Sequence, residues 1–102
     1  MAPHSEHERD RALLRACKEG NPYALQELSD RYYTDIFLKL NEVLGSYGYV
    51  PDALHDMTLD CLGKLCEGTD SVMHWCDLDT AVIRLAASYA RVELVKALRQ
   101  KP

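Results

Sequence analysis

The chain has 102 residues, 47% hydrophobic and 27% charged, which predicts one compact domain and argues against a disordered chain. No apolar run approaches the length of a membrane span and no signal-peptide core opens the sequence, so we expect a cytoplasmic protein. The net charge of −4 conceals two opposite segments, because residues 52–79 hold seven acids and one base, whereas residues 84–101 hold five bases and one acid. This asymmetry predicts one basic and one anionic partner.

The first segment, residues 1–8, is polar and has no hydrophobic period, so it is expected to be flexible. The helical domain is then expected to occupy residues 9–102. It begins with a short helix from about Arg9 to Lys18. Gly20 suits the left-handed conformation that ends such a helix.

A long second helix is predicted from about Pro22 to Leu44. Asn21 is expected to cap this helix, and Pro22 fits its first turn because the missing N–H costs nothing there. Apolar residues recur at three- and four-residue steps, which predicts a buried stripe of Leu25, Leu28, Tyr32, Ile36, Leu40 and Val43. The stretch "GSYGYVP" then predicts a loop.

A third helix is predicted from about Asp52 to Cys66, with two contrasting faces. The predicted core face carries Leu54, Met57, Cys61, Leu62 and Leu65. The opposite face carries the acids Asp52, Asp56, Asp60 and Glu67, with Leu59 at its edge. The stretch "EGTDSVMHWC" that follows is predicted to be a loop.

The last helix is predicted from about Leu78 to Arg99, with Asp77 or Asp79 as its N-cap. Its predicted buried stripe is Leu78, Val82, Leu85, Tyr89 and Val92, and a neighbouring stripe holds Arg84, Ser88, Arg91 and Arg99. No segment has the period of a strand. The fold class is therefore all-α, with three principal helices and a short N-terminal one.

Catalytic and metal sites are not indicated. No Ser/His/Asp or Cys/His motif and no phosphate-binding loop is visible, so neither an enzyme nor a cofactor is expected. A ligand set could be assembled from Cys61, Cys66, His74 and Cys76, but its spacing does not match a zinc knuckle. The cysteines, including Cys17, are predicted to be small buried hydrophobes without a metal.

The basic stripe of the last helix has two interpretations. Arg84, Arg91 and Arg99 lie seven and eight residues apart, so they line one side, as in helices that follow a phosphate backbone. A solvated face with cations near the helix C-terminus explains them equally well. In the preceding loop, Met73, His74 or Trp75 could stack on an unpaired base, although Trp75 could instead close the end of the bundle.

The order of these features resembles region 2 of the extracytoplasmic-function sigma factors. "LLRACKEGNPYALQELSDRYY" looks like the opening of that region, a short helix, a Gly-Asp/Asn turn and a helix containing E-L. "HDMTLDCLGKL" is similar to the family's next helix, and "VIRLAASYARVELVKALR" is similar to its promoter-reading helix. The resemblance extends from about Asp10 to Lys101 and implies a sigma region 2-like helical bundle.

The resemblance implies two contact surfaces. The third helix would dock on the clamp helices of the β′ subunit of core RNA polymerase, through Asp52, Asp56, Leu59, Asp60 and Gly63. The last helix and the loop before it would engage the minus-ten promoter element, as a single non-template strand, through Met73, His74, Trp75, Arg84, Ser88, Arg91 and Arg99. An anti-sigma factor is a further candidate partner.

The chain departs from the family pattern in both helices: the third keeps the family's charge better than its residues, and the promoter-reading helix is eroded. Leu59, Leu62 and Cys66 replace a glutamine, a phenylalanine and an aromatic residue of the third helix. In the promoter-reading helix, the usual tryptophan, asparagine and aspartate are replaced by Ala81, Ser88 and Val92. These departures keep a second interpretation open, in which a sigma-like module binds polymerase or an anti-sigma partner without reading promoter DNA.

Overall fold

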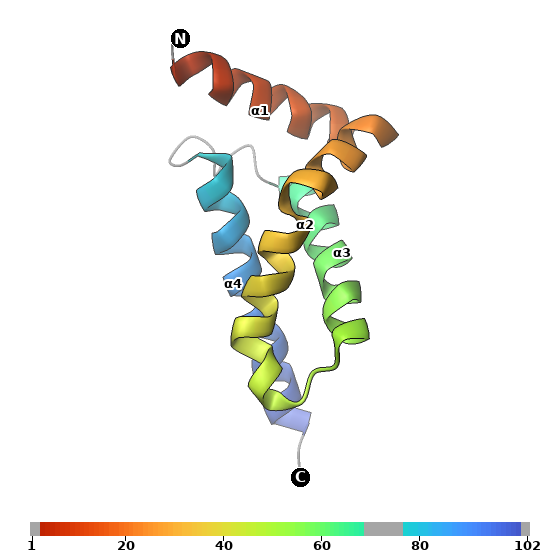
Figure 1. Cartoon of the computed structure of the whole chain (residues 1–102), viewed down its shortest axis with the longest axis vertical. Coiled ribbons are helices and arrows are strands. Elements are labelled where there is room, and N and C mark those ends of the chain that lie inside the picture. Colours follow the sequence, from red (N-terminus) through yellow and green to blue (C-terminus); the bar gives the residue numbers. More distant parts are fainter. Residues whose placement is uncertain (1–2, 69–76, 101–102) are drawn as a thin grey trace.

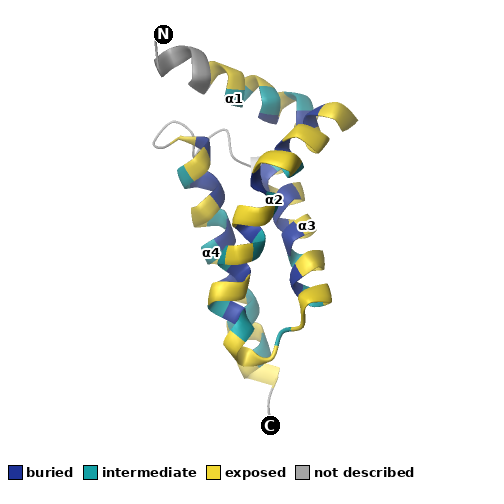
Figure 2. Cartoon of the chain, viewed as in Figure 1, coloured by how far each residue is buried: buried dark blue, intermediate teal, exposed yellow. Residues whose placement is uncertain are grey.

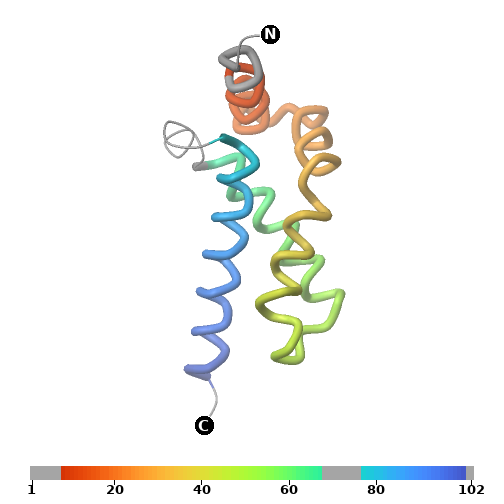
Figure 3. The backbone as a smooth tube through the Cα atoms, turned by 60° about the vertical axis from the view of Figure 1, so that its left-hand side comes forward, coloured from red at the N-terminus to blue at the C-terminus, as the bar shows by residue number. Residues whose placement is uncertain are grey.

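The computed structural model describes residues 3–68 and 77–100, and within them the chain is all-α, as predicted. Four helices, α1 (Pro3–Lys18), α2 (Pro22–Leu44), α3 (Pro51–Gly68) and α4 (Leu78–Gln100), are joined in part by a short 3-10 helix, η1 (Gly45–Tyr47). Figure 1 shows α2, α3 and α4 running along the long axis, with α1 across the end nearest the N-terminus. Figure 3 shows the same arrangement from a second direction.

The first helix is longer than the sequence predicted. The helix was expected to begin at about Arg9, but α1 begins at Pro3. Gly20 follows the end of α1 in the left-handed conformation, as predicted, with φ +90°. The Gly20 N–H donates to the carbonyl of Cys17 and the Asn21 N–H donates to that of Ala16, both at 3.0 Å, the paired bonds of a Schellman stop.

The ends of the other helices follow from local sequence. The Asn21 side chain accepts from the backbone N–H of Tyr23 at 2.9 Å, which caps α2 directly before Pro22. Gly48, with φ +87°, turns the chain between η1 and α3. Of the two candidate caps for α4, Asp77 fills the role, because its carboxylate accepts from the N–H of Thr80 at 2.8 Å.

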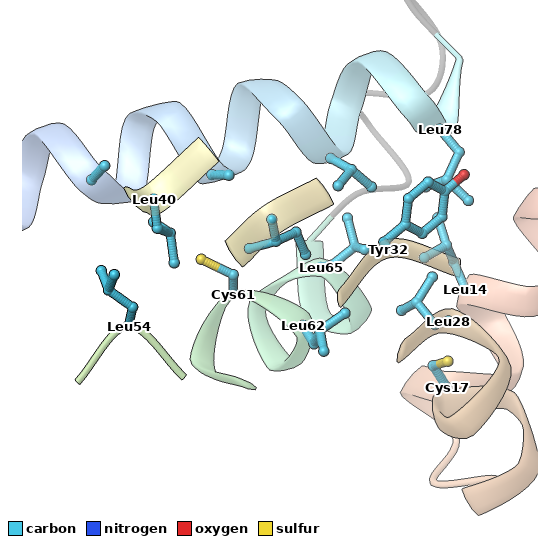
Figure 4. Close-up of a cluster of buried hydrophobic side chains, with 14 of the residues drawn as sticks. Leu14, Cys17, Leu28, Tyr32, Leu40, Leu54, Cys61, Leu62, Leu65 and Leu78 are labelled. Atoms are coloured by element: carbon cyan, nitrogen blue, oxygen red, sulfur yellow. The ribbon is translucent and has the colours of Figure 1, made fainter. Parts of the chain in front are cut away.

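The core is a row of side chains between the three long helices. Figure 4 shows it extending from Leu40 and Leu54 at one end to Leu14 and Leu78 at the other. On α2 the buried residues recur at every fourth position, namely Ala24, Leu28, Tyr32, Ile36, Leu40 and Leu44. A four-residue step drifts by about 40° around the helix axis. The buried line therefore winds around α2 and lets it contact each of the other three helices.

Part of the predicted core is wrong. Leu25 is 45% exposed and Val43 is only partly buried, because the core line on α2 passes through Ala24 and Leu44 instead. On α3, Leu54, Cys61, Leu62 and Leu65 of the predicted core face are buried, whereas Met57 is only half-buried. The buried face also contains Thr58, whose hydroxyl donates to the carbonyl of Leu54 at 2.7 Å.

On α4 small residues replace the predicted large ones. Besides Leu78 and Val82, the buried residues are Ala81, Ala86 and Ala90. Leu85 and Tyr89 are half-buried, and Val92 is exposed, contrary to prediction. Alanine leaves room for a neighbouring helix to come close, so α4 packs on α2 through its least bulky face. Figure 2 shows burial fading towards the C-terminal end of α4.

A polar network joins α1, α2 and α4 at one end of the bundle. The hydroxyl of Tyr32, a residue only 4% exposed, donates to Asp79 of α4 at 2.5 Å and accepts from Arg31 Nη2 at 2.9 Å. Arg31 Nη1 also donates to Asp10 of α1 at 3.0 Å. Burial and the hydrogen bond to Asp79 raise the pKa of the Tyr32 hydroxyl. The network therefore fixes how α1 and α4 sit on α2.

None of the helices in the described part of the chain has a stretch of the length and apolarity needed to cross a bilayer.

Candidate functional site

The acidic face of α3 is exposed, as the sequence predicted. Asp52, Asp56, Asp60 and Glu67 all reach solvent, and Leu59 is 49% exposed beside them. Gly63 lies on the same face, and a Cβ built there meets no atom within 4 Å. The five predicted polymerase-binding residues therefore share one open surface, which we call the α3 face: Asp52, Asp56, Leu59, Asp60 and Gly63.

Beside the α3 face lies a shallow apolar groove between α2 and α3. It has a volume of about 340 Å³ and is lined by Pro22, Leu25, Gln26, Ser29, Leu59, Leu62 and Gly63. Leu25 and Leu59 supply exposed apolar surface from opposite walls. Because the apolar pattern of α2 predicted Leu25 to be in the core, this groove was not predicted from the sequence. Ala24 could have indicated the groove from the sequence. It begins the series of buried residues that recur at every fourth position of α2, and this series leaves Leu25 at the edge of the buried face.

One member of the α3 face is engaged within the fold. The hydroxyl of Tyr89 on α4 donates to Asp60 Oδ2 at 2.7 Å. Burial and this hydrogen bond raise the pKa of the Tyr89 hydroxyl. Asp60 therefore helps to fix α4 against α3, whereas the side chains of Asp56 and Leu59 make no such bond within the described residues.

The predicted basic stripe is also exposed, but it is not purely basic. Arg84, Ser88, Arg91 and Arg99 all reach solvent on one side of α4. Three apolar side chains stand among the last two arginines, with Val92 51%, Val95 46% and Leu98 54% exposed. The N-terminal half of the stripe is thus polar and the C-terminal half is mixed. The predicted base-stacking residues Met73, His74 and Trp75 lie outside the described residues.

Three of the four cysteines can be placed. Cys17 and Cys61 are buried and Cys66 is half-buried, all as free thiols, whereas Cys76 lies outside the described residues. Burial raises the pKa of the Cys61 thiol to about 12. Burial, with a hydrogen bond to Cys17, raises that of Cys66 to about 12 as well. Thiols held neutral in this way are poor nucleophiles.

Neither wall of the α2–α3 groove carries a group with an assignable catalytic role. Within residues 3–68 and 77–100, no three His, Cys, Asp or Glu side chains are arranged to hold a metal ion. The arrangement instead offers two exposed surfaces of opposite charge. It is suited to binding macromolecules.

Comparison of the chain with protein-family models, with curated proteins and with solved structures finds no significant match.

Proposed function

We propose that this chain is a sigma region 2-like domain that binds core RNA polymerase through the α3 face and engages the minus-ten promoter element through α4. The observation that carries the proposal is the α3 face itself. Its acids and its half-exposed leucine are turned away from the core, beside an apolar groove. A basic coiled coil with apolar side chains, such as the β′ clamp helices, complements both features.

Asp56 and Leu59 form the centre of the proposed docking surface, because Asp60 is held by Tyr89. Leu59 would enter the contact together with Leu25 across the groove, and Asp56 would meet a basic group of the polymerase. Asp60 would contribute mainly by keeping α4 in place. This division predicts that Asp60 variants lose stability as well as binding.

Binding of purified core RNA polymerase to the full chain tests the docking surface. Asp56→Lys sets like charges against a basic clamp and should weaken binding at least about tenfold. Leu59→Ala should weaken it about fivefold, since truncating a central apolar contact costs on the order of 1 kcal/mol.

The matched controls for this test are Asp35→Lys and Leu38→Ala. Both residues are exposed on α2, where they line a shallow groove on the side facing Ile83 of α4. Circular dichroism is recorded for every variant as the control for folding. If Asp56→Lys and Leu59→Ala bind polymerase as tightly as their controls, the docking surface is wrong.

The DNA part of the proposal concerns the N-terminal half of the stripe, Arg84, Ser88 and Arg91. If these arginines contact phosphates, the log of affinity for a single-stranded minus-ten oligonucleotide falls with log salt by roughly 0.7 per contact. Arg84→Ala with Arg91→Ala should then flatten the slope, measured with and without core polymerase. An unchanged slope in the double variant would contradict the proposal that α4 contacts DNA.

A second candidate function is favoured by the C-terminal half of α4. Exposed Val92, Val95 and Leu98 do not suit a phosphate backbone, but they suit a protein partner. In this alternative the chain is a sigma-like interaction module that binds polymerase or an anti-sigma partner without reading promoter DNA. Retained polymerase binding with no shift of minus-ten oligonucleotides would identify it.

A further inference from the structure

The C-terminal end of α4 presents an unusual surface. None of residues 91–100 is buried, although this stretch contains several apolar side chains. Val92, Val95 and Leu98 each expose about half of their surface, at 51%, 46% and 54%. Figure 2 shows exposed and half-buried residues around this end of α4. A single exposed apolar side chain is ordinary, but a group of neighbouring ones such as Val92, Val95 and Leu98 is typical of an interaction surface.

The arginines of this stretch lie within the apolar surface rather than beside it. At about 100° per residue, Leu98, Arg91, Val95, Arg99 and Val92 follow one another around the helix within about 120°. We call these five residues the α4 end surface. The nearby acid, Glu93, lies on the other side of the helix and is paired with Lys96 at 3.6 Å. The α4 end surface is therefore both apolar and positively charged, with no acid in it.

We propose that the α4 end surface binds an acidic amphipathic helix of a partner protein. Leucine-like side chains of that helix would cover Val92, Val95 and Leu98. Aspartate or glutamate side chains at neighbouring positions would pair with Arg91 and Arg99, since alternation of apolar and acidic groups on the partner matches the alternation on α4.

Three other occupants fit the surface less well. A phosphate backbone would pair with the arginines but would leave Val95 between them without an apolar contact. A membrane surface favours basic residues that flank an apolar stripe, whereas here Arg91 and Arg99 would have to enter the acyl layer with it. A two-fold pair of this chain would bring Arg91 and Arg99 of both copies together.

The acidic α3 face of a second copy has a suitable charge, but that contact is head-to-tail. Such contacts leave a free surface at each end and generate open-ended assemblies unless the rotation closes a ring. A separate acidic partner satisfies the charge and the apolar area without this consequence. The proposal concerns a surface distinct from the α3 face, so it stands or falls independently of docking on polymerase. It shares Arg91 with the proposed DNA contact, so an acidic helix and DNA would compete for that side chain.

The test uses the isotope-labelled full chain and two short designed helical peptides. Both peptides carry the same leucine stripe, flanked by glutamates in one and by lysines in the other. Titration followed by backbone-amide NMR should show that the glutamate peptide shifts the signals of residues 91–99 and that the lysine peptide does not. Arg91→Glu with Arg99→Glu should weaken the glutamate peptide at least about tenfold, because like charges then face each other. Val95→Ser should weaken it about fivefold through the loss of apolar contact.

The control variants are Arg15→Glu, an exposed base on α1, and Leu38→Ser, an exposed apolar residue on α2. Both should bind the glutamate peptide like the unmodified chain. The proposal is overturned if the two peptides bind alike, or if neither binds.

Three parallel measurements give the other occupants their own outcomes. Anionic phosphatidylglycerol vesicles and a single-stranded oligonucleotide are titrated against the same signals, and sedimentation velocity reports self-association. If vesicles or the oligonucleotide shift the signals of residues 91–99 and the glutamate peptide does not, the proposal is overturned in favour of a membrane or a nucleic acid. Self-association that depends on Arg91 and Arg99 would overturn it in favour of a second copy of this chain.

Discussion

Tyr32→Phe removes one hydroxyl group from the junction of α1, α2 and α4 while keeping the buried ring. The hydroxyl makes two bonds to charged groups, donating to Asp79 at 2.5 Å and accepting from Arg31 at 2.9 Å. Hydrogen bonds to charged groups contribute about 1.5–3 kcal/mol each when their partners are shielded. Asp79 and Arg31 both reach solvent, so water can replace the hydroxyl for each of them. We therefore expect a loss of about 1.5 kcal/mol in the free energy of unfolding for the two bonds together.

Urea denaturation followed by circular dichroism measures this loss directly. In a chain of this length, 1 kcal/mol corresponds to about 4–8 °C in the melting temperature, so the variant should melt about 6–12 °C lower. Tyr23→Phe is the matched control, because Tyr23 is 83% exposed and should change stability by less than about 0.5 kcal/mol.

A double-mutant cycle with Asp79→Ala separates the bond from the other effects of each change. Asp79 also lies in the first turn of α4, where a carboxylate is favourable, and the cycle cancels that contribution. A coupling energy near zero between the two substitutions would refute the argument that Tyr32 holds α4 through Asp79. A Tyr32→Phe variant as stable as Tyr23→Phe would do the same.

Two further predictions concern pH and glycine. The ordinary pKa values are 9.0 for Cys61 and 10.0 for Tyr32 and Tyr89, and the fold raises all three, that of Cys61 to about 12. The folded chain therefore holds more protons than the unfolded chain above pH 9. The stability that these three groups contribute is fully present below pH 9 and is lost as pH rises towards 12. Thermal melts across this range check the prediction, and constant stability to pH 11 would contradict it. Gly20→Ala should lower the free energy of unfolding by about 1–2 kcal/mol, because a Cβ is strained at its φ of +90°. Gly63→Ala should raise the free energy of unfolding by about 0.8–1 kcal/mol, because alanine is the better helix former and an added Cβ meets open space there. Equal changes for the two variants in urea denaturation would contradict both expectations.

The helix bounds that the sequence predicted well are those marked by capping residues. Asn21 and Pro22 open α2 and Gly45 follows its end, so the bounds Pro22–Leu44 are confirmed. Pro3 stands at the first position of α1, as Pro22 does in α2, but residues 3–8 are polar and have no hydrophobic period, so the start of α1 was predicted too late.

The predicted core failed where burial depends on how closely two helices approach. Alanine adds little to a hydrophobic pattern, so Ala86 and Ala90 were passed over in favour of the larger Leu85, Tyr89 and Val92. In the structure, the close approach of α4 to α2 buries the small residues. Size and hydrophobicity along one helix do not contain this information, because the neighbouring helix decides it.

The candidate site shows the same division. The exposure of Asp56 and Leu59 follows from the amphipathic pattern of α3 alone, and it is confirmed. The apolar groove needs Leu25 from α2, and the bond from Tyr89 to Asp60 needs α4, so both depend on contacts between helices. The assignment of the α3 face to polymerase and of α4 to DNA stays a prediction.

From the short connections between the first three helices, we expect contacts among these helices to form before α4 docks. A Schellman turn joins α1 to α2, and residues 45–50 are all that separate α2 from α3. Short loops close within about 10–100 ns, so contacts between these helices form early. The bond from Tyr32 to Asp79 joins residues 47 positions apart and has to wait for α4 to dock. We therefore expect this junction to form after the transition state, where it governs the lifetime of the folded chain more than its rate of folding.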